Sequence, residues 1–239
     1  MPLTTPKASD TTLATCPRCH NQHPMPVIRL IGGHVVDKAI CPDCAENEEH
    51  QQEARVARWK WEEEHKHELA KERAWESICP PLYRLTDPAR LPQDKVAAVL
   101  AWQYGPEGLL LIGPTATGKT RAVYLLLKQL FDAGRQITAF DCAAFGHECS
   151  RRFRDGTGED WADDLAQRQV VFLDDVGKNP FTERVEAELF ALVERRTANL
   201  LPIIATLNMT GEQLQAKTSQ DRGAAMVRRL REFSKVILF

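Results

Sequence analysis

The pattern of hydrophobic and polar positions divides the chain into zones of different character. Residues 1–15 are polar and rich in threonine, which predicts a disordered tail. Residues 45–78 are dense in charge and contain neither Gly nor Pro, which predicts one long, solvated helix that ends before Pro80. From there onward the composition becomes globular. We therefore expect a tail at 1–15, a cysteine module at 16–44, a helical arm at 45–78 and a globular domain at 79–239.

Apolar runs in the globular part predict the strands of a parallel sheet. Such strands are covered on both faces, so they are nearly continuous hydrophobic stretches. The run at 108–112 is followed by a glycine-rich loop and by a helical pattern that Gly134 closes as a C-cap. Further runs lie at 169–177, 201–209 and 235–239. This order of elements predicts an α/β fold.

The loop after the first of these strands carries a phosphate-binding motif. The stretch GPTATGKT fits G-x-x-x-x-G-K-[ST], and it lies between a strand and a helix, as a P-loop requires. Its backbone N–H groups and the helix N-terminus favour bound phosphate. Lys119 is expected to reach the β- and γ-phosphates of ATP, and Thr120 to bind Mg²⁺. The predicted nucleotide-contacting residues are Gly113, Pro114, Thr115, Ala116, Thr117, Gly118, Lys119, Thr120 and Asp174.

Polar side chains at the ends of two other predicted strands extend this site. Asp174 and Asp175 end the run at 169–177, and Asn208 ends the run at 201–209. The carboxyl ends of parallel strands are where α/β sheets bind ligands. We expect Asp174 to hold Mg²⁺, largely through water, and Asp175 to polarise the attacking water. Asn208 could orient that water, although an Asn at a strand end is more often a turn residue.

Four of the seven cysteines form two C-x-x-C pairs, CPRC and CPDC. Residues 20–40 lie between the pairs, a slightly longer spacing than in most four-cysteine zinc sites. The apolar segments around Gly32-Gly33 predict a hairpin, so the module resembles a zinc ribbon in outline. The predicted Zn²⁺ ligands are Cys16, Cys19, Cys41 and Cys44, with His20, His23 or His34 as possible substitutes for one Cys. Four thiolates would make the site structural, and a redox pair is the alternative.

Composition restricts where the protein acts and which partners it can bind. The net charge of −2 excludes a generally basic nucleic-acid binder, so DNA contact would need a local patch. No apolar run approaches a membrane span, and the N-terminus lacks the apolar core of a signal peptide. We therefore expect a cytoplasmic protein without membrane contact.

The motifs together resemble AAA+ ATPases, and more narrowly the bacterial replicative helicase loaders of the DnaC and DnaI type and the related IstB ATPases. The resemblance covers roughly 79–239 and rests on the P-loop, FLDDVG, IATLN and a following Arg-rich helix, with CPPLYRL as the entry segment. It implies an AAA+ domain without a full helical lid. By this resemblance Asp174 and Asp175 form the Walker B pair and Asn208 takes the sensor 1 position. Glu is commoner where Asp175 stands, so slow turnover is expected.

The resemblance also implies an arginine finger in the stretch DRGAAMVRRLREFS. Arg229 fits the finger best, with Arg228 beside it, and a finger implies an ATP-dependent homo-oligomer. The alternative is a purely structural role, in which an arginine near the helix C-terminus complements the helix dipole. The family usually has a further Arg before the finger, whereas this chain has AAM there.

Two more segments are candidates for binding partners. In the stretch 142–161, aromatic and basic residues interleave in a way that suits single-stranded DNA, although the Phe residues could instead be core. The residues concerned are Phe145, Phe153, Arg151, Arg152 and Arg154. The charged arm holds Trp59, Trp61 and Trp75, which indicate either a docking face or a solvated connector whose Trp residues pack on the zinc module.

These features predict an ATP-dependent loader that delivers a replicative DNA helicase to single-stranded DNA. One alternative is an IstB-like ATPase that serves a transposase on duplex DNA. Another is a zinc-anchored adaptor in which nucleotide switches affinity with little hydrolysis.

Overall fold

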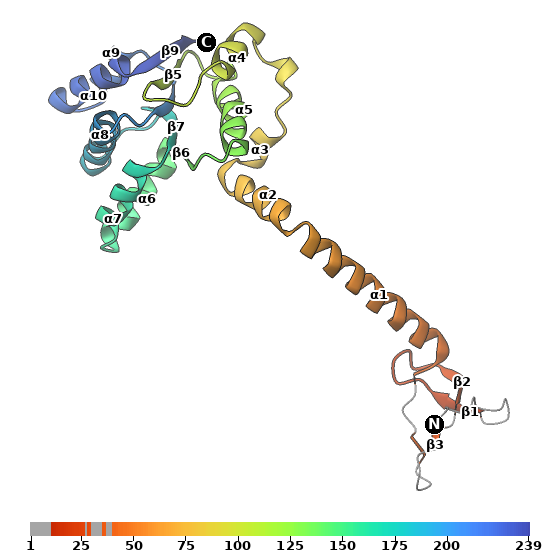
Figure 1. Cartoon of the computed structure of the whole chain (residues 1–239). Helices are drawn as coiled ribbons and strands as arrows, with labels where there is room; N and C mark the ends of the chain where they lie inside the picture. The colour runs from red at the N-terminus through yellow and green to blue at the C-terminus, as the bar shows by residue number, and fades with distance from the viewer. Residues whose placement is uncertain (1–10, 27, 30–34, 37–39) are drawn as a thin grey trace. The chain divides into compact units, whose positions relative to one another are not determined.

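The computed structural model describes residues 11–26, 28–29, 35–36 and 40–239 of the chain, in two compact units that meet between Ala70 and Lys71 (Figure 1). In the N-terminal unit, β1 (Thr11–Thr15) pairs antiparallel with β2 (Gln22–Pro26), and β3 (Ile28–Arg29) pairs with β4 (Val35–Val36). The predicted turn at Gly32-Gly33 lies outside the described residues.

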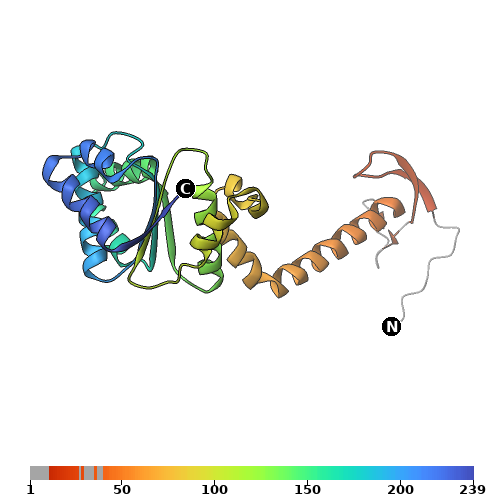
Figure 2. The same ribbon diagram turned by 90° about the horizontal axis from the view of Figure 1, so that it is seen from above.

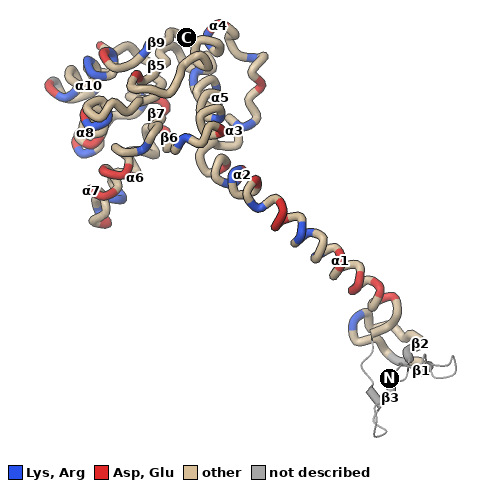
Figure 3. The backbone as a smooth tube through the Cα atoms, in the orientation of Figure 1, with Lys and Arg blue, Asp and Glu red and all other residues tan. Residues whose placement is uncertain are grey.

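Two predictions for this unit need correction. Residues 11–15 form a strand instead of a disordered tail, because they pair along their whole length with residues 22–26 and their β-branched threonines suit extended backbone. The helical arm is two helices, α1 (Pro42–Glu64) and α2 (Lys66–Ile78), with His65 between them. Figure 3 shows the acidic and basic positions that alternate along them and keep α1 solvated.

The second unit is built on a five-stranded parallel sheet of order β6-β7-β8-β5-β9. The strands are β5 (Gly108–Ile112), β6 (Ile137–Asp141), β7 (Val170–Val176), β8 (Ile203–Leu207) and β9 (Ser234–Leu238). The expected α/β P-loop fold is confirmed, and the four predicted strands are all present.

Helices cover both faces of this sheet (Figures 1 and 2). One face packs against α2, α4 (Gln93–Leu100) and α5 (Lys119–Asp132). The other packs against α6 (Cys142–Arg154), α7 (Gly158–Gln167), α8 (Glu183–Ala198) and α10 (Gln220–Glu232). The short elements are α3 (Pro81–Arg84), the 3-10 turn η1 (Pro88–Arg90) and α9 (Gly211–Ala216). Alternate residues of β5 show the two-sided burial: Leu109 and Leu111 enter the first core, and Leu110 enters the second.

The globular unit begins earlier than residue 79. Trp75 is buried against Phe131, with the ring centroids 5.4 Å apart, and the ammonium of Lys128 lies 5.7 Å from its ring. Cys79 is also buried. The C-terminal turns of α2 therefore belong to the sheet-containing core, because their apolar side chains fill the face beside α5.

Candidate nucleotide site and metal centre

The predicted phosphate loop connects β5 to α5 with the backbone that a phosphate cradle needs. Gly118 has φ of 97° and Ala116 has φ of 62°, both in the left-handed region, and the loop ends at the N-terminus of α5. A Cβ atom at Gly113 would lie 2.3 Å from the carbonyl oxygen of Phe239, so only glycine fits where β5 ends. The free N–H groups of this loop and helix can bind phosphate oxygens.

Lys119 is buried beneath the loop, with 4 % of its surface exposed. Its Nζ donates to the carbonyl oxygens of Gly113 at 2.8 Å and Pro114 at 2.5 Å. Burial lowers the pKa of this ammonium, while the charge of Asp175 opposes the shift. The side chain is thus a cation held in the loop, with its charge next to the cradle.

Asp174 and Thr120 form an oxygen cluster of the kind that magnesium prefers. The hydroxyl of Thr120 donates to Oδ1 of Asp174 at 2.8 Å, and the hydroxyl of Thr206 donates to the same oxygen at 2.5 Å. Burial raises the pKa of Asp174, and the two hydroxyl donors act against that rise. A buried carboxylate beside a hydroxyl fits the hard-oxygen preference of Mg²⁺, so these two residues would hold the ion.

Asp175 sits on an irregular turn at the end of β7. Its φ is 56°, and the pairing of β7 with β8 shifts register between Leu173 and Val176. The N–H of Asp175 donates to Thr206 Oγ1 at 2.8 Å, and Nδ2 of Asn208 donates to Oδ1 of Asp175 at 2.6 Å. Nζ of Lys178 donates to Oδ2 at 2.9 Å. Asp175 is therefore held by Thr206 of β8, by Asn208 just after that strand and by Lys178 just after β7.

Lys119, Thr120, Asp175 and Asn208 line one cleft of about 970 Å³, which is at the upper end of the range for small-molecule pockets. Most of its charged lining residues are cationic, which suits a polyphosphate. Sequence reasoning missed several of these residues because they belong to no motif: Tyr83, Leu85, Arg90, Lys95, Arg121 and Lys178. Only Tyr83 and Leu85 had a signal, as part of the entry segment CPPLYRL.

Tyr83 packs the entry segment against α5, the helix that follows the phosphate loop. Its ring stacks on Tyr124 of α5 with the centroids 4.7 Å apart. Arg121 donates to the carbonyl of Leu82 at 3.2 Å and to Thr86 Oγ1 at 3.1 Å. The segment that lines one side of the cleft is therefore fixed to the first turns of α5.

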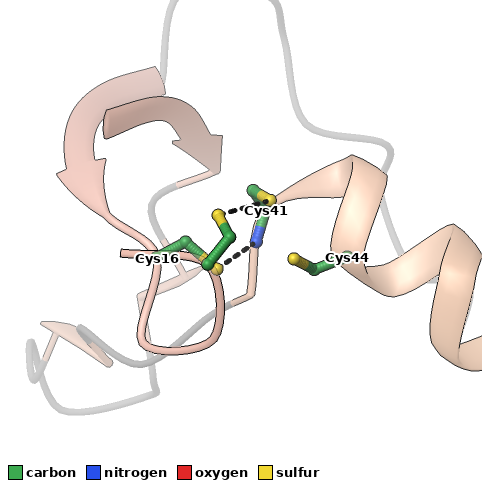
Figure 4. Close-up of side chains that lie close together, drawn as sticks. Cys16, Cys41 and Cys44 are labelled. Atoms are coloured by element: carbon green, nitrogen blue, oxygen red, sulfur yellow. Dashed lines mark hydrogen bonds between the residues drawn. The ribbon is translucent and has the colours of Figure 1, made fainter. Parts of the chain in front are cut away.

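The four predicted cysteine ligands converge in the N-terminal unit, and Figure 4 shows three of them, Cys16, Cys41 and Cys44. Their sulfur atoms all lie within 4.8 Å of one another, and the sulfurs of Cys19 and Cys41 are 3.9 Å apart. Tetrahedral thiolate ligands at about 2.3 Å from zinc would be about 3.8 Å apart, so the cluster fits Zn²⁺. Backbone N–H groups, first that of Cys19 and then that of Cys41, lower the pKa of Cys16 to about 6.

The histidine and redox alternatives can be compared with this geometry. Nε2 of His23 lies 3.3 Å from the sulfur of Cys19, which places His23 beside the cluster as a hydrogen-bond partner of a ligand. His20 is exposed, and His34 lies outside the described residues. Cys16 and Cys41 are fully buried, whereas reactive cysteines are partly exposed. The cluster therefore favours a structural metal over a redox pair.

Only some of the side chains that were predicted to contact DNA are exposed. Phe145 is buried in the core, so it cannot stack on bases, and the core alternative is correct for it. Phe153 is partly buried under the guanidinium of Arg184, 4.7 Å from its ring centroid. Glu148 accepts from both Arg151 and Arg152 at 2.7 Å.

The other predicted contact residues lie outside the cleft. Arg229 is paired with Glu194 of α8, and the neighbouring Arg228 is exposed. Neither lines the cleft of its own chain, so a finger role would require a neighbouring protomer. Trp59 and Trp61 are exposed, whereas the burial of Trp75 excludes it from a docking face.

Comparisons with known proteins agree with this fold. The family model of the IstB-like ATP binding protein matches residues 47–238. A DnaI structure is 19 % identical with TM-score 0.54, covering 70 % of this chain and 93 % of that one. The DnaC helicase loader is 18 % identical with TM-score 0.52, covering 62 % and 86 %. AMPPCP-bound DnaA from Aquifex aeolicus is 17 % identical with TM-score 0.53, covering 65 % and 47 %.

At these identities the likeness of the solved structures concerns the fold alone. The chain spans about half the length of two of the DnaA structures that it matches. No curated protein matches the sequence. Among the residues that the structure describes, no helix is both long and apolar enough to cross a membrane.

Proposed function

Since the chain belongs to the family of IstB-like ATP binding proteins, we propose that it hydrolyses ATP to load a replicative helicase onto single-stranded DNA. The observation that carries the ATPase is the convergence of Lys119, Thr120, Asp175 and Asn208 on one cationic cleft, with Asp174 bonded to Thr120 behind it. Lys119 stabilises charge on the γ-phosphate, and Asp175 polarises the attacking water while Asn208 holds its carboxylate. Mg²⁺, held by Thr120 and Asp174, supplies charge neutralisation when it is bound.

Asp175→Asn tests this division of roles between the two acids. The amide keeps the size of the side chain but cannot act as a base, so kcat should fall by about 10²- to 10⁴-fold while ATP still binds. Equilibrium nucleotide binding and phosphate release are measured on the same protein. Loss of binding together with turnover would mean that Asp175, and not only Asp174, supports the metal.

We propose that helicase docking uses the exposed face of α1 that contains Trp59 and Val56. Trp59 is 63 % exposed, and Val56 lies one turn earlier on the same face. Trp61 lies about 200° away around the helix and stacks on His65. The two tryptophans therefore cannot belong to one groove-binding stripe, which makes Trp61 a natural control.

Trp59→Ala should weaken binding of the full chain to the cognate replicative helicase by about 2 kcal/mol. Trp61→Ala should change the binding free energy by far less. The α-helical content should be unchanged in both variants because both side chains are exposed. Binding is measured by calorimetry or by pull-down with purified helicase. Equal effects of the two substitutions would contradict docking through a single face.

The transposition-type ATPase remains the second candidate, because the description of the matching family model favours it. It predicts that duplex DNA, more than single strands, stimulates hydrolysis, and that the N-terminal unit binds DNA. The loader predicts stimulation by single strands and capture of the helicase. Assembly into an ATP-dependent homo-oligomer, with Arg229 or Arg228 reaching a neighbour's nucleotide, is part of either proposal.

A further inference from the structure

The loop after β7 places Lys178 against the carboxylate of Asp175, the group that is proposed to polarise water. Gly177 has φ of 81°, and the N–H of Lys178 donates to the carbonyl oxygen of Asp175 at 3.1 Å. Nζ of Lys217 donates to the carbonyl of Gly177 at 2.9 Å and holds the turn from α9's end. The backbone of this turn therefore directs Lys178 back over Asp175, and both residues line the cleft.

Both oxygens of the Asp175 carboxylate are engaged in this arrangement. Asn208 donates to Oδ1, and the ammonium of Lys178 lies 2.9 Å from Oδ2. A carboxylate that accepts a hydrogen bond from attacking water needs an oxygen lone pair facing that water. A charge-assisted bond to the ammonium of Lys178 takes up a lone pair of Oδ2 and orients that oxygen toward the lysine.

The lysine is the partner that can leave this contact. Its side chain is 59 % exposed, against 21 % for Asp175. Asp175 is fixed by its left-handed backbone, by the bond from its N–H to Thr206 of β8 and by the amide of Asn208, whereas Lys178 has a flexible four-carbon stem. The ion pair can therefore open by movement of Lys178 alone.

We propose that Lys178 is a positioning residue that restrains Asp175 and keeps basal ATP hydrolysis low. This rests on the proposed ATPase function. While the pair is closed, the ammonium of Lys178 competes with the attacking water for Oδ2. When Lys178 moves away, Oδ2 becomes free, and no other contact of the site has to change. An activating partner could then raise the rate simply by presenting an anion to Lys178.

Lys178→Met tests the restraint in the full chain. It keeps most of the side-chain length without the charge, so kcat should rise about fivefold, which corresponds to about 1 kcal/mol in the barrier. KM should stay within about twofold, and Lys178→Arg should retain the low rate. Lys128→Met is the matched control, because it removes an exposed lysine paired with Asp132 outside the cleft. Its rate should equal that of the wild type.

Three results would overturn the restraint. A lower kcat in Lys178→Met would make the lysine a transition-state ligand, and an unchanged kcat would reduce the contact to a surface ion pair. A raised rate that persists in Asp175→Asn/Lys178→Met would show that Asp175 is not the group restrained. If the rate of hydrolysis falls in Asp175→Asn but is unchanged in Lys178→Met, the restraint is disproved and the proposed ATPase function stands. If the wild type and Lys178→Met both bind ATP without hydrolysing it, the proposed ATPase fails as well.

Discussion

Lys119→Ala is expected to abolish ATP turnover and to weaken nucleotide binding severely. Among the described residues, Lys119 is the only buried charged side chain that donates to carbonyl oxygens of the phosphate loop. Its charge gains importance as the γ-phosphate leaves, so kcat/KM should fall by at least about 10²-fold. Binding of a fluorescent ATP analogue and phosphate release measure the two effects separately.

The substitution also removes the donor to two loop carbonyls, so its effect on folding has to be separated from its effect on chemistry. Lys119→Arg keeps the charge and the donors but changes their geometry, and it should restore loop stability without restoring turnover. Thermal unfolding of all three proteins provides the comparison. Normal hydrolysis by a folded Lys119→Ala protein would disprove the site.

Cys16→Ser is expected to remove Zn²⁺ and unfold the N-terminal hairpins while the ATPase keeps working. Purified, reduced wild-type protein should contain about one Zn²⁺ per chain, because the four thiols form one ligand set. So small a module could hardly keep its fold without the metal. All residues of the nucleotide cleft lie in the other compact unit, so the hydrolysis rate should be unchanged.

Metal analysis by mass spectrometry, circular dichroism and ATPase assays check these three expectations. His23→Ala is the informative control: it should lower zinc affinity modestly if His23 only donates to Cys19, and abolish binding if it is a ligand. Wild-type protein without zinc would disprove the ribbon. Loss of hydrolysis in Cys16→Ser would mean that the two units depend on each other.

The central strands and the motifs could be predicted from the sequence because both are local patterns. Continuous apolar runs mark β5, β7 and β8, and the acids and Asn208 follow directly from strand ends. Their convergence could be predicted because parallel strands end at one edge. The left-handed backbone of Asp175 could not, because it arises from a register shift against β8.

Residues whose environment depends on tertiary packing were the ones predicted less well. Trp75 is in a charged segment, and only the position of α5 shows that it is buried. Phe145 shares its sequence stretch with three arginines, but in α6 its side chain enters the core while Arg151 and Arg154 are exposed. Strand β6 is partly exposed at the sheet edge, so it lacks the continuous apolar run of the central strands.

The position of β5 in the sheet determines when the phosphate loop can form during synthesis. Both neighbours of β5 come late in the chain: Leu110 pairs with Ala205 of β8 and with Val236 of β9. The strand that leads into the loop therefore leaves the ribosome long before either of its partners. Such distant pairings are slow to form, and until then the apolar β5 has two unpaired edges. The nascent chain should acquire nucleotide-binding ability only after β9 has emerged, in one late step.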